Sequence, residues 1–172
     1  FQLRKQLGLP RDAFVDIVSL LELALPVIDP SFNLLPVPDK ELSGRYAETR
    51  PYEHAIYVKE SVYDAAIRGG GQARMILAHE LAHYLYHSPR EISFAYVNRN
   101  ERLDSNVDPE RQPDIFAAEF LAPSGELRGL SVSDVQRKFG VSALAAKNQL
   151  RQASNIARRH ASKKKRRSGP KA

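Results

Sequence analysis

The chain has 172 residues, of which 42% are hydrophobic and 27% charged, and its net charge is +6. This length allows one domain with a buried core, or a catalytic unit with a small helical appendage. The absence of cysteine excludes disulfides and thiolate metal ligands and predicts a cytoplasmic protein. No apolar run approaches the ~20 residues that span a membrane, so we expect no contact with a membrane.

The N-terminal region predicts one amphipathic helix. This helix is expected to open at residues 10–13 and to end near Pro26. Its apolar residues repeat at helical spacing and are Phe14, Ile17, Val18, Leu21 and Leu25.

Three short β-prone runs follow, over residues 32–37, 44–49 and 54–60, with proline or glycine between them. They predict a small antiparallel sheet, in which residues 55–58 form the strongest strand. We expect this strand either at an edge, where extended substrate backbone can pair with it, or inside the sheet.

Residues 73–87 predict a buried helix that carries a metal-binding motif, because residues 79–83 read His-Glu-Leu-Ala-His. Each helical residue turns by about 100°, so His79 and His83 lie about 40° apart on one face and can bind one ion. Glu80 is rotated off that face, which suits a base acting on water better than a ligand. The alternative is a packed helix with capped or solvated histidines.

A catalytic zinc site usually has three protein ligands and an open position for water, so the motif needs a third ligand. Glu110 and Asp114 share a face of a second predicted helix, over residues 110–123. Pro113 favours a helix start near itself, which leaves Glu110 just before the helix or in its first turn. The other candidate ligands are His87, Asp104, Asp108 and Glu119.

Two of these alternatives have other expected roles. His87 is expected to cap the C-terminus of the first site helix, where a cation complements the helix dipole. Glu119 lies about 180° from Glu110 around the second helix and is expected to be solvated.

Together the two motifs resemble the ImmA/IrrE family of metallo-endopeptidases, whose signature pairs HExxH with a later helix of the type E-x-x-x-N-x-F-A-A-x-L-L-x-P. Residues 116–118 and 123 match its Phe-Ala-Ala and Pro, and Asp114 stands where the family usually has Asn. An Asp at this place is similar to the one that orients a ligand His in thermolysin-like enzymes. The resemblance implies a Zn²⁺ site with the ligands His79, His83 and Glu110, the general base Glu80 and the supporting residue Asp114.

The resemblance also implies a function. Members of the family cleave a repressor of the XRE helix-turn-helix type, commonly encoded beside them, and so switch on a stress or mobile-element response. We therefore expect a zinc-dependent endopeptidase that controls transcription by limited proteolysis. The sequence does not identify the donor that stabilises the oxyanion of the reaction. Its candidates are Tyr84, Tyr86 and Tyr96, and the alternative role of each is packing in the core.

The C-terminal part predicts two helices and a basic tail. Ser133 is expected to cap the first helix, Gly140 to end it and Ser142 to cap the second, in a pattern that resembles a helix-turn-helix. Such pairs bind DNA in some proteins and are structural in others. Residues 158–172 contain eight Lys or Arg and no acid. This tail is expected to be disordered in isolation, and either to make weak phosphate contacts with nucleic acid or to aid solubility.

The predicted fold class is α+β, with a small antiparallel sheet packed on the two site helices and a helix-turn-helix-like part after them. The expected domains are residues 1–128 for the peptidase, 129–157 for the helix-turn-helix-like region and 158–172 for the tail. Residues 89–109 are expected to form a lid or an ordinary surface loop. The rival hypothesis is a DNA- or partner-binding regulator, similar to half of a toxin–antitoxin pair, in which His87 or Asp104 closes a structural metal site.

Overall fold

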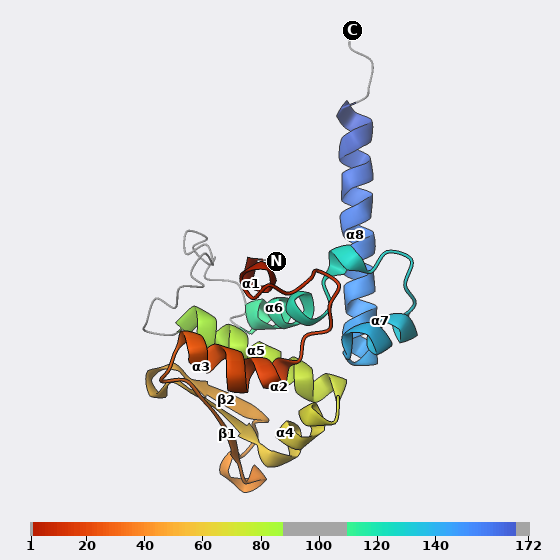
Figure 1. Ribbon diagram of the computed structural model, residues 1–172. Helices are drawn as coiled ribbons and strands as arrows, with labels where there is room; N and C mark the ends of the chain where they lie inside the picture. Colours follow the sequence, from red (N-terminus) through yellow and green to blue (C-terminus); the bar gives the residue numbers. More distant parts are fainter. Residues whose placement is uncertain (1, 88–109, 168–172) are drawn as a thin grey trace.

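The computed structural model describes the backbone of residues 2–87 and 110–167 (Figure 1). It has an α+β fold, as predicted, in which one three-stranded sheet packs against helices. The α-helices are α1 (Gln2–Gln6), α2 (Ile17–Ser19), α3 (Leu25–Ile28), α4 (Glu60–Ile67), α5 (Gly71–His87), α6 (Arg111–Leu121), α7 (Val132–Phe139) and α8 (Ala143–Arg167), and the strands are β1 (Asn33–Val37), β2 (Ala47–Arg50) and β3 (Ala55–Lys59). None of the helices in the two described ranges is apolar over a length that would span a membrane.

The sheet is mixed, with the strand order β1-β3-β2. β2 is antiparallel to β3, but β1 is parallel to it, so the prediction of an antiparallel sheet is wrong for β1. The physical reason is the connection, because β1 and β3 are joined through β2 on the far side of β3 rather than by a hairpin.

β3 is the central strand, so the expectation of an edge strand at residues 55–58 is wrong and its alternative, an internal strand, holds. Ala55, Ile56 and Val58 are at most 2% exposed although they point to both faces of the sheet. A strand covered on both faces needs apolar residues in succession. The edge strand that packs against α5 is β2.

The first predicted helix begins later and ends later than expected. Residues 10–16 are not helical, α2 begins at Ile17 behind the N-cap Asp16, and Phe14 is 49% exposed. A π-helical turn, Leu20–Ala24, carries the helix past Pro26 to Ile28. Because proline lacks an N–H and its ring meets the preceding turn, the shift to wider hydrogen bonds makes room for it.

α5 forms the centre of the molecule, between the sheet and α6 (Figure 1). Its residues Leu77, Leu81 and Tyr84 are at most 1% exposed and lie one turn apart on the face turned to the core. Each side chain of this kind contributes about 1.5–3 kcal/mol when fully buried. This packing fixes the rotation of α5, and with it the direction of its polar face.

The C-terminal helices α7 and α8 follow a short turn. Ser131, not Ser133 as predicted, is the N-cap of α7, because its side chain and that of Asp134 form a capping box. Gly140 ends α7 in the left-handed conformation at φ 61°, and the Ser142 side chain accepts from the Ala145 N–H at 3.2 Å, as predicted. The two helices of the expected motif are therefore present.

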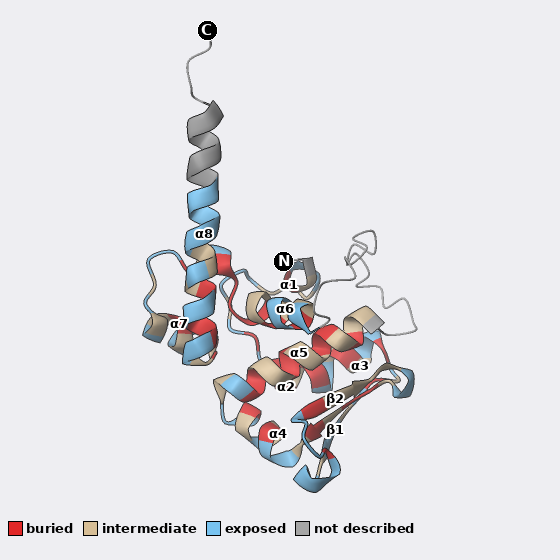
Figure 2. Cartoon of the chain, turned by 180° about the vertical axis from the view of Figure 1, so that it is seen from behind, coloured by how far each residue is buried: buried red, intermediate tan, exposed pale blue. Residues whose placement is uncertain are grey.

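α8 continues to Arg167, so residues 158–167 are helical where the sequence predicted a disordered tail. Lys, Arg and Ala all have high helix propensity, and the start of α8 is packed against the rest of the molecule, which supplies the nucleus for helix growth. Residues 154–159 are exposed, and α8 extends away from the body of the molecule (Figure 2).

Candidate metal centre

The two histidines of the motif face one another across one turn of α5. Their Nε2 atoms are 3.0 Å apart, and their side chains are 19% and 21% exposed. The apolar face of α5 is buried, so the opposite face presents both imidazoles at the surface where α6 crosses. The structure therefore places His79 and His83 together, as the spacing predicted.

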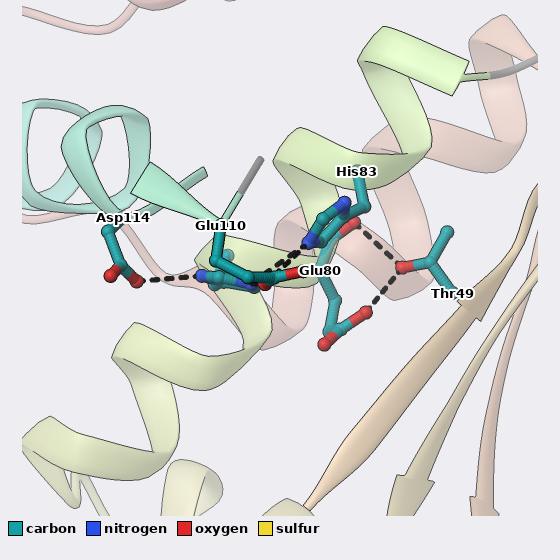
Figure 3. A network of polar contacts seen from close by, with 6 residues as sticks. Thr49, Glu80, His83, Glu110 and Asp114 are labelled. Carbon is teal, nitrogen blue, oxygen red and sulfur yellow. Dashed lines mark hydrogen bonds and ion pairs between the residues drawn. The ribbon is translucent and has the colours of Figure 1, made fainter. Parts of the chain in front are cut away.

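Glu110 completes the cluster from the second helix. Its Oε2 atom lies 3.1 Å from Nε2 of His79 and 3.3 Å from Nε2 of His83 (Figure 3). The residue is the N-cap of α6, directly before the helix, although α6 begins at Arg111 rather than near Pro113. Pro113 is tolerated because N–H groups in the first turn have no partner inside the helix.

Asp114 lies one turn after Glu110 on α6, and its Oδ1 atom is 2.8 Å from Nδ1 of His79 (Figure 3). A carboxylate at this distance accepts a hydrogen bond from a protonated Nδ1, and in the neutral ring this tautomer leaves the lone pair on Nε2, which faces the cluster. Acidic partners orient metal-binding histidines in this way in many proteins.

The three converging atoms fit a divalent cation. Two imidazole nitrogens and one carboxylate oxygen converge to within 3.0–3.3 Å of one another. With both Nε2 atoms unprotonated, three lone pairs would meet at this point, and a cation between them would remove the repulsion. Three such donors around a tetrahedral ion, at bond lengths of about 2.0–2.2 Å, lie roughly 3.3 Å apart. Among the described residues, this is the one group of three or more His, Asp or Glu whose donor atoms converge.

Glu80 does not join the three donors. Its Oε2 atom accepts a hydrogen bond from Oγ1 of Thr49 at 2.6 Å, and the same hydroxyl lies 2.9 Å from the main-chain oxygen of Glu80 (Figure 3). The sequence pointed to no role for Thr49, because nothing local connects it with a helix residue 31 positions later. A carboxylate beside the cluster is thus held by the edge strand β2.

The comparison with protein families matches the geometry. Residues 35–151 match the profile of the Peptidase_M78 family, described as the IrrE N-terminal-like domain. The chain belongs to this family. The resemblance seen in the two motifs is therefore confirmed, and the matched region is a metallopeptidase-like domain that contains both site helices. Neither the curated proteins nor the solved structures include a match to the chain.

Of the other acidic candidates, the one that the structure describes is Glu119, and it does not take part in the cluster. Glu119 was expected in solvent, but it accepts hydrogen bonds from the Gln149 and Gln152 side chains, both at 3.1 Å, and from the Ser124 N–H at 3.2 Å. The expectation failed because it considered α6 alone, whereas α8 packs on that side. Asp104 and Asp108 lie outside the described residues, as do the side chain of His87 and the expected loop at 89–109.

The tyrosine candidates have packing roles where they are described. Tyr84 is fully buried, and its hydroxyl donates to Oδ2 of Asp29 at 2.5 Å, so it is not available to a substrate. Burial raises the pKa of the Asp29 carboxyl, but hydrogen bonds from Tyr84 and His54 outweigh it and hold the pKa below its ordinary value. Tyr86 packs edge-on against Phe116, and burial raises its pKa. Tyr96 lies outside the described residues.

Proposed function

We propose that the chain is a zinc-dependent endopeptidase. The observation that carries the proposal is the convergence of His79, His83 and Glu110, with a separate carboxylate, Glu80, on the same helix as the histidines. Three ligands leave one position of a tetrahedral zinc site open to a reactant, whereas a structural site is closed by four. The family match supports the same chemistry.

Different residues of the chain have different roles in the proposed peptide hydrolysis. When bound, the zinc ion supplies a Lewis acid that polarises the scissile carbonyl and lowers the pKa of a water molecule. Glu80 accepts one proton from the attacking water while the oxygen of that water forms a bond to the carbonyl carbon. Glu80 then delivers that proton to the nitrogen as the C–N bond breaks. Asp114 keeps Nε2 of His79 directed at the ion.

The edge of β2 supports the binding of an extended peptide. β2 pairs with β3 along one edge, and along its other edge no strand is found among the described residues. Unpaired N–H and C=O groups of such an edge can pair with substrate backbone. Thr49 links this edge to Glu80, so a peptide paired with β2 would pass close to the base.

For the substrate, we propose a regulatory protein, and specifically an XRE-type helix-turn-helix repressor encoded near this chain. This proposal follows from the resemblance to the ImmA/IrrE family and implies cytoplasmic proteolysis that controls transcription under stress. The test is incubation of the zinc-loaded chain with that repressor, followed by mass spectrometry of the products. One defined cut that requires metal is expected, and an intact repressor would contradict the proposal.

A second candidate function is nucleic-acid contact through the C-terminal helices. The observation in its favour is that α8 extends from the body with residues 154–159 exposed, and that residues 158–167 of this helix hold seven Lys or Arg and no acid. Basic side chains on such a helix can contact phosphates without reading sequence. In this view the chain is a regulator, and the metal site is structural or idle.

A further inference from the structure

Thr49 and Glu80 form the closest polar contact between β2 and the site helix α5 in the described structure. The hydroxyl of Thr49 is 2.6 Å from Oε2 of Glu80, which is within the range of a charge-assisted O–H···O⁻ hydrogen bond. We infer that Thr49 is the positioning residue for Glu80, holding one carboxylate oxygen so that the other one exchanges the proton. The inference rests on the proposed peptidase function.

The two oxygens of Glu80 have different surroundings. Oε2 is bound by Thr49, whereas Oε1 makes no hydrogen bond with any residue in the described part of the chain. A hydroxyl carries a single proton, and the shorter contact to Oε2 takes it in preference to the main-chain oxygen at 2.9 Å. Oε1 is thus the oxygen that accepts the proton from water and returns it to the leaving nitrogen.

Thr49 is suited to this task by its place in the sheet. In the β2–β3 ladder it pairs with Ile56, so its backbone is fixed, and its β-branched side chain is stiff at χ1. Glu80 by contrast has three rotatable bonds and is half-buried on the polar side of α5. A fixed hydroxyl therefore selects one conformation of the Glu80 side chain before substrate binds. This lowers the entropy cost of placing the carboxylate for proton transfer during the reaction.

The test compares the unmodified chain with Thr49→Val, which removes the hydroxyl but keeps the branched shape, and Thr49→Ser, which keeps the hydroxyl. Thr49→Ala is made in parallel, so that the test does not depend on one variant folding. The matched control is Ser61→Ala, because Ser61 also donates to a carboxylate at 2.6 Å, on Asp39, away from the cluster. The probe is a quenched fluorescent peptide that spans the bond cut in the repressor.

We expect kcat of Thr49→Val and Thr49→Ala to fall by about tenfold to a hundredfold, with KM within about twofold and one zinc ion retained per chain. Thr49→Ser should restore kcat to within about threefold of the unmodified chain, and Ser61→Ala should match it. A purely structural link between β2 and α5 would instead alter zinc content or KM. Equal kcat in the unmodified chain and Thr49→Val, or no rescue by serine, would overturn the inference.

A crystal structure of Thr49→Val provides a readout that needs no activity. We expect the Glu80 carboxylate to leave its present position and to occupy several side-chain conformations. An unchanged Glu80 in that structure would overturn the inference even if no substrate is found. Failure of the unmodified chain to cleave any repressor would instead contradict the proposed function, so the two failures are distinguishable.

Discussion

At the scale of single residues, a substitution of Glu80 distinguishes the peptidase hypothesis from the hypothesis of a binding module. Glu80→Gln keeps the size of the side chain but cannot take a proton, and its carboxylate is not among the three converging donors. We expect zinc content to be unchanged and cleavage of the repressor to fall by at least about 10²-fold. Zinc is measured by atomic emission and cleavage by electrophoresis. An undiminished biological effect of this variant in cells would favour the regulator with an idle metal site.

Asp114 is expected to act through His79 rather than on the substrate. Removing its carboxylate in Asp114→Ala frees the imidazole to rotate, so we predict zinc affinity about 10- to 100-fold weaker, measured by competition with a chromogenic chelator. Asp114→Asn keeps an acceptor oxygen and should lie within about threefold of the unmodified chain. The control is Asp64→Ala, an aspartate on α4 that is 59% exposed. Equal affinity in Asp114→Ala and the control would refute this role.

The sequence predicts the site residues to different extents, for physical reasons. The relation of His79 to His83 depends only on helix geometry, so the spacing was sufficient. The approach of Glu110 to both rings depends on how α5 crosses α6, which spacing does not contain, and its prediction came from the resemblance. Thr49 was missed altogether, because its contact with Glu80 depends on which strand forms the edge of the sheet.

At the scale of elements, Glu119 and Gln149 connect the site helix α6 to α8. Gln149 is 2% exposed and donates to the main-chain oxygen of Ala122 at 2.8 Å as well as to Glu119. In Gln149→Leu the leucine side chain has a size similar to that of glutamine, but it donates no hydrogen bond, so the acceptors on Ala122 and Glu119 have fewer partners. We therefore predict a loss of about 1–3 kcal/mol in the free energy of unfolding.

Urea unfolding followed by circular dichroism measures this loss. The control is Lys147→Leu, an exposed position on the same helix, which should change the free energy by less than about 0.5 kcal/mol. Equal stability of Gln149→Leu and the unmodified chain would show that α6 and α8 are joined by apolar contacts alone.

The elements themselves were predictable where local signals dominate. The apolar periodicity predicts α5, and Gly140 and Ser142 predict the boundary between α7 and α8. Periodicity does not reveal the π-helical turn before Pro26 or the parallel pairing of β1 with β3, because both depend on packing between distant segments. The helical state of residues 158–167 was missed because charge suggested disorder, whereas propensity favoured a helix already nucleated at Ala143.

At the scale of the whole molecule, the charge is divided between a body and a basic end. Residues 158–172 hold eight of the 26 Lys and Arg, so the remainder of the chain has a net charge of −2. The family match ends at residue 151, before this segment. The segment for which nucleic-acid contact is proposed therefore lies outside the residues that match the family.

The prediction for this basic end is salt-dependent binding of duplex DNA without sequence preference. Each phosphate contact changes the slope of log K against log salt by about 0.9, so converting Lys163, Lys164 and Lys165 to Gln should reduce the slope by up to about 2.7. Fluorescence anisotropy at several salt concentrations measures it. The control converts Lys5, Lys40 and Lys59 to Gln, with the same change in charge. Equal slopes for the two triple variants would assign the basic end to solubility.

Anomalous X-ray diffraction at the zinc edge, from crystals of the zinc-loaded chain, is the most direct test of the metal centre. We predict one peak within about 2.0–2.2 Å of Nε2 of His79, Nε2 of His83 and an oxygen of Glu110. Glu80 should remain outside bonding distance of the ion. A peak that Glu110 does not contact, or no peak between the two imidazoles, would contradict the account.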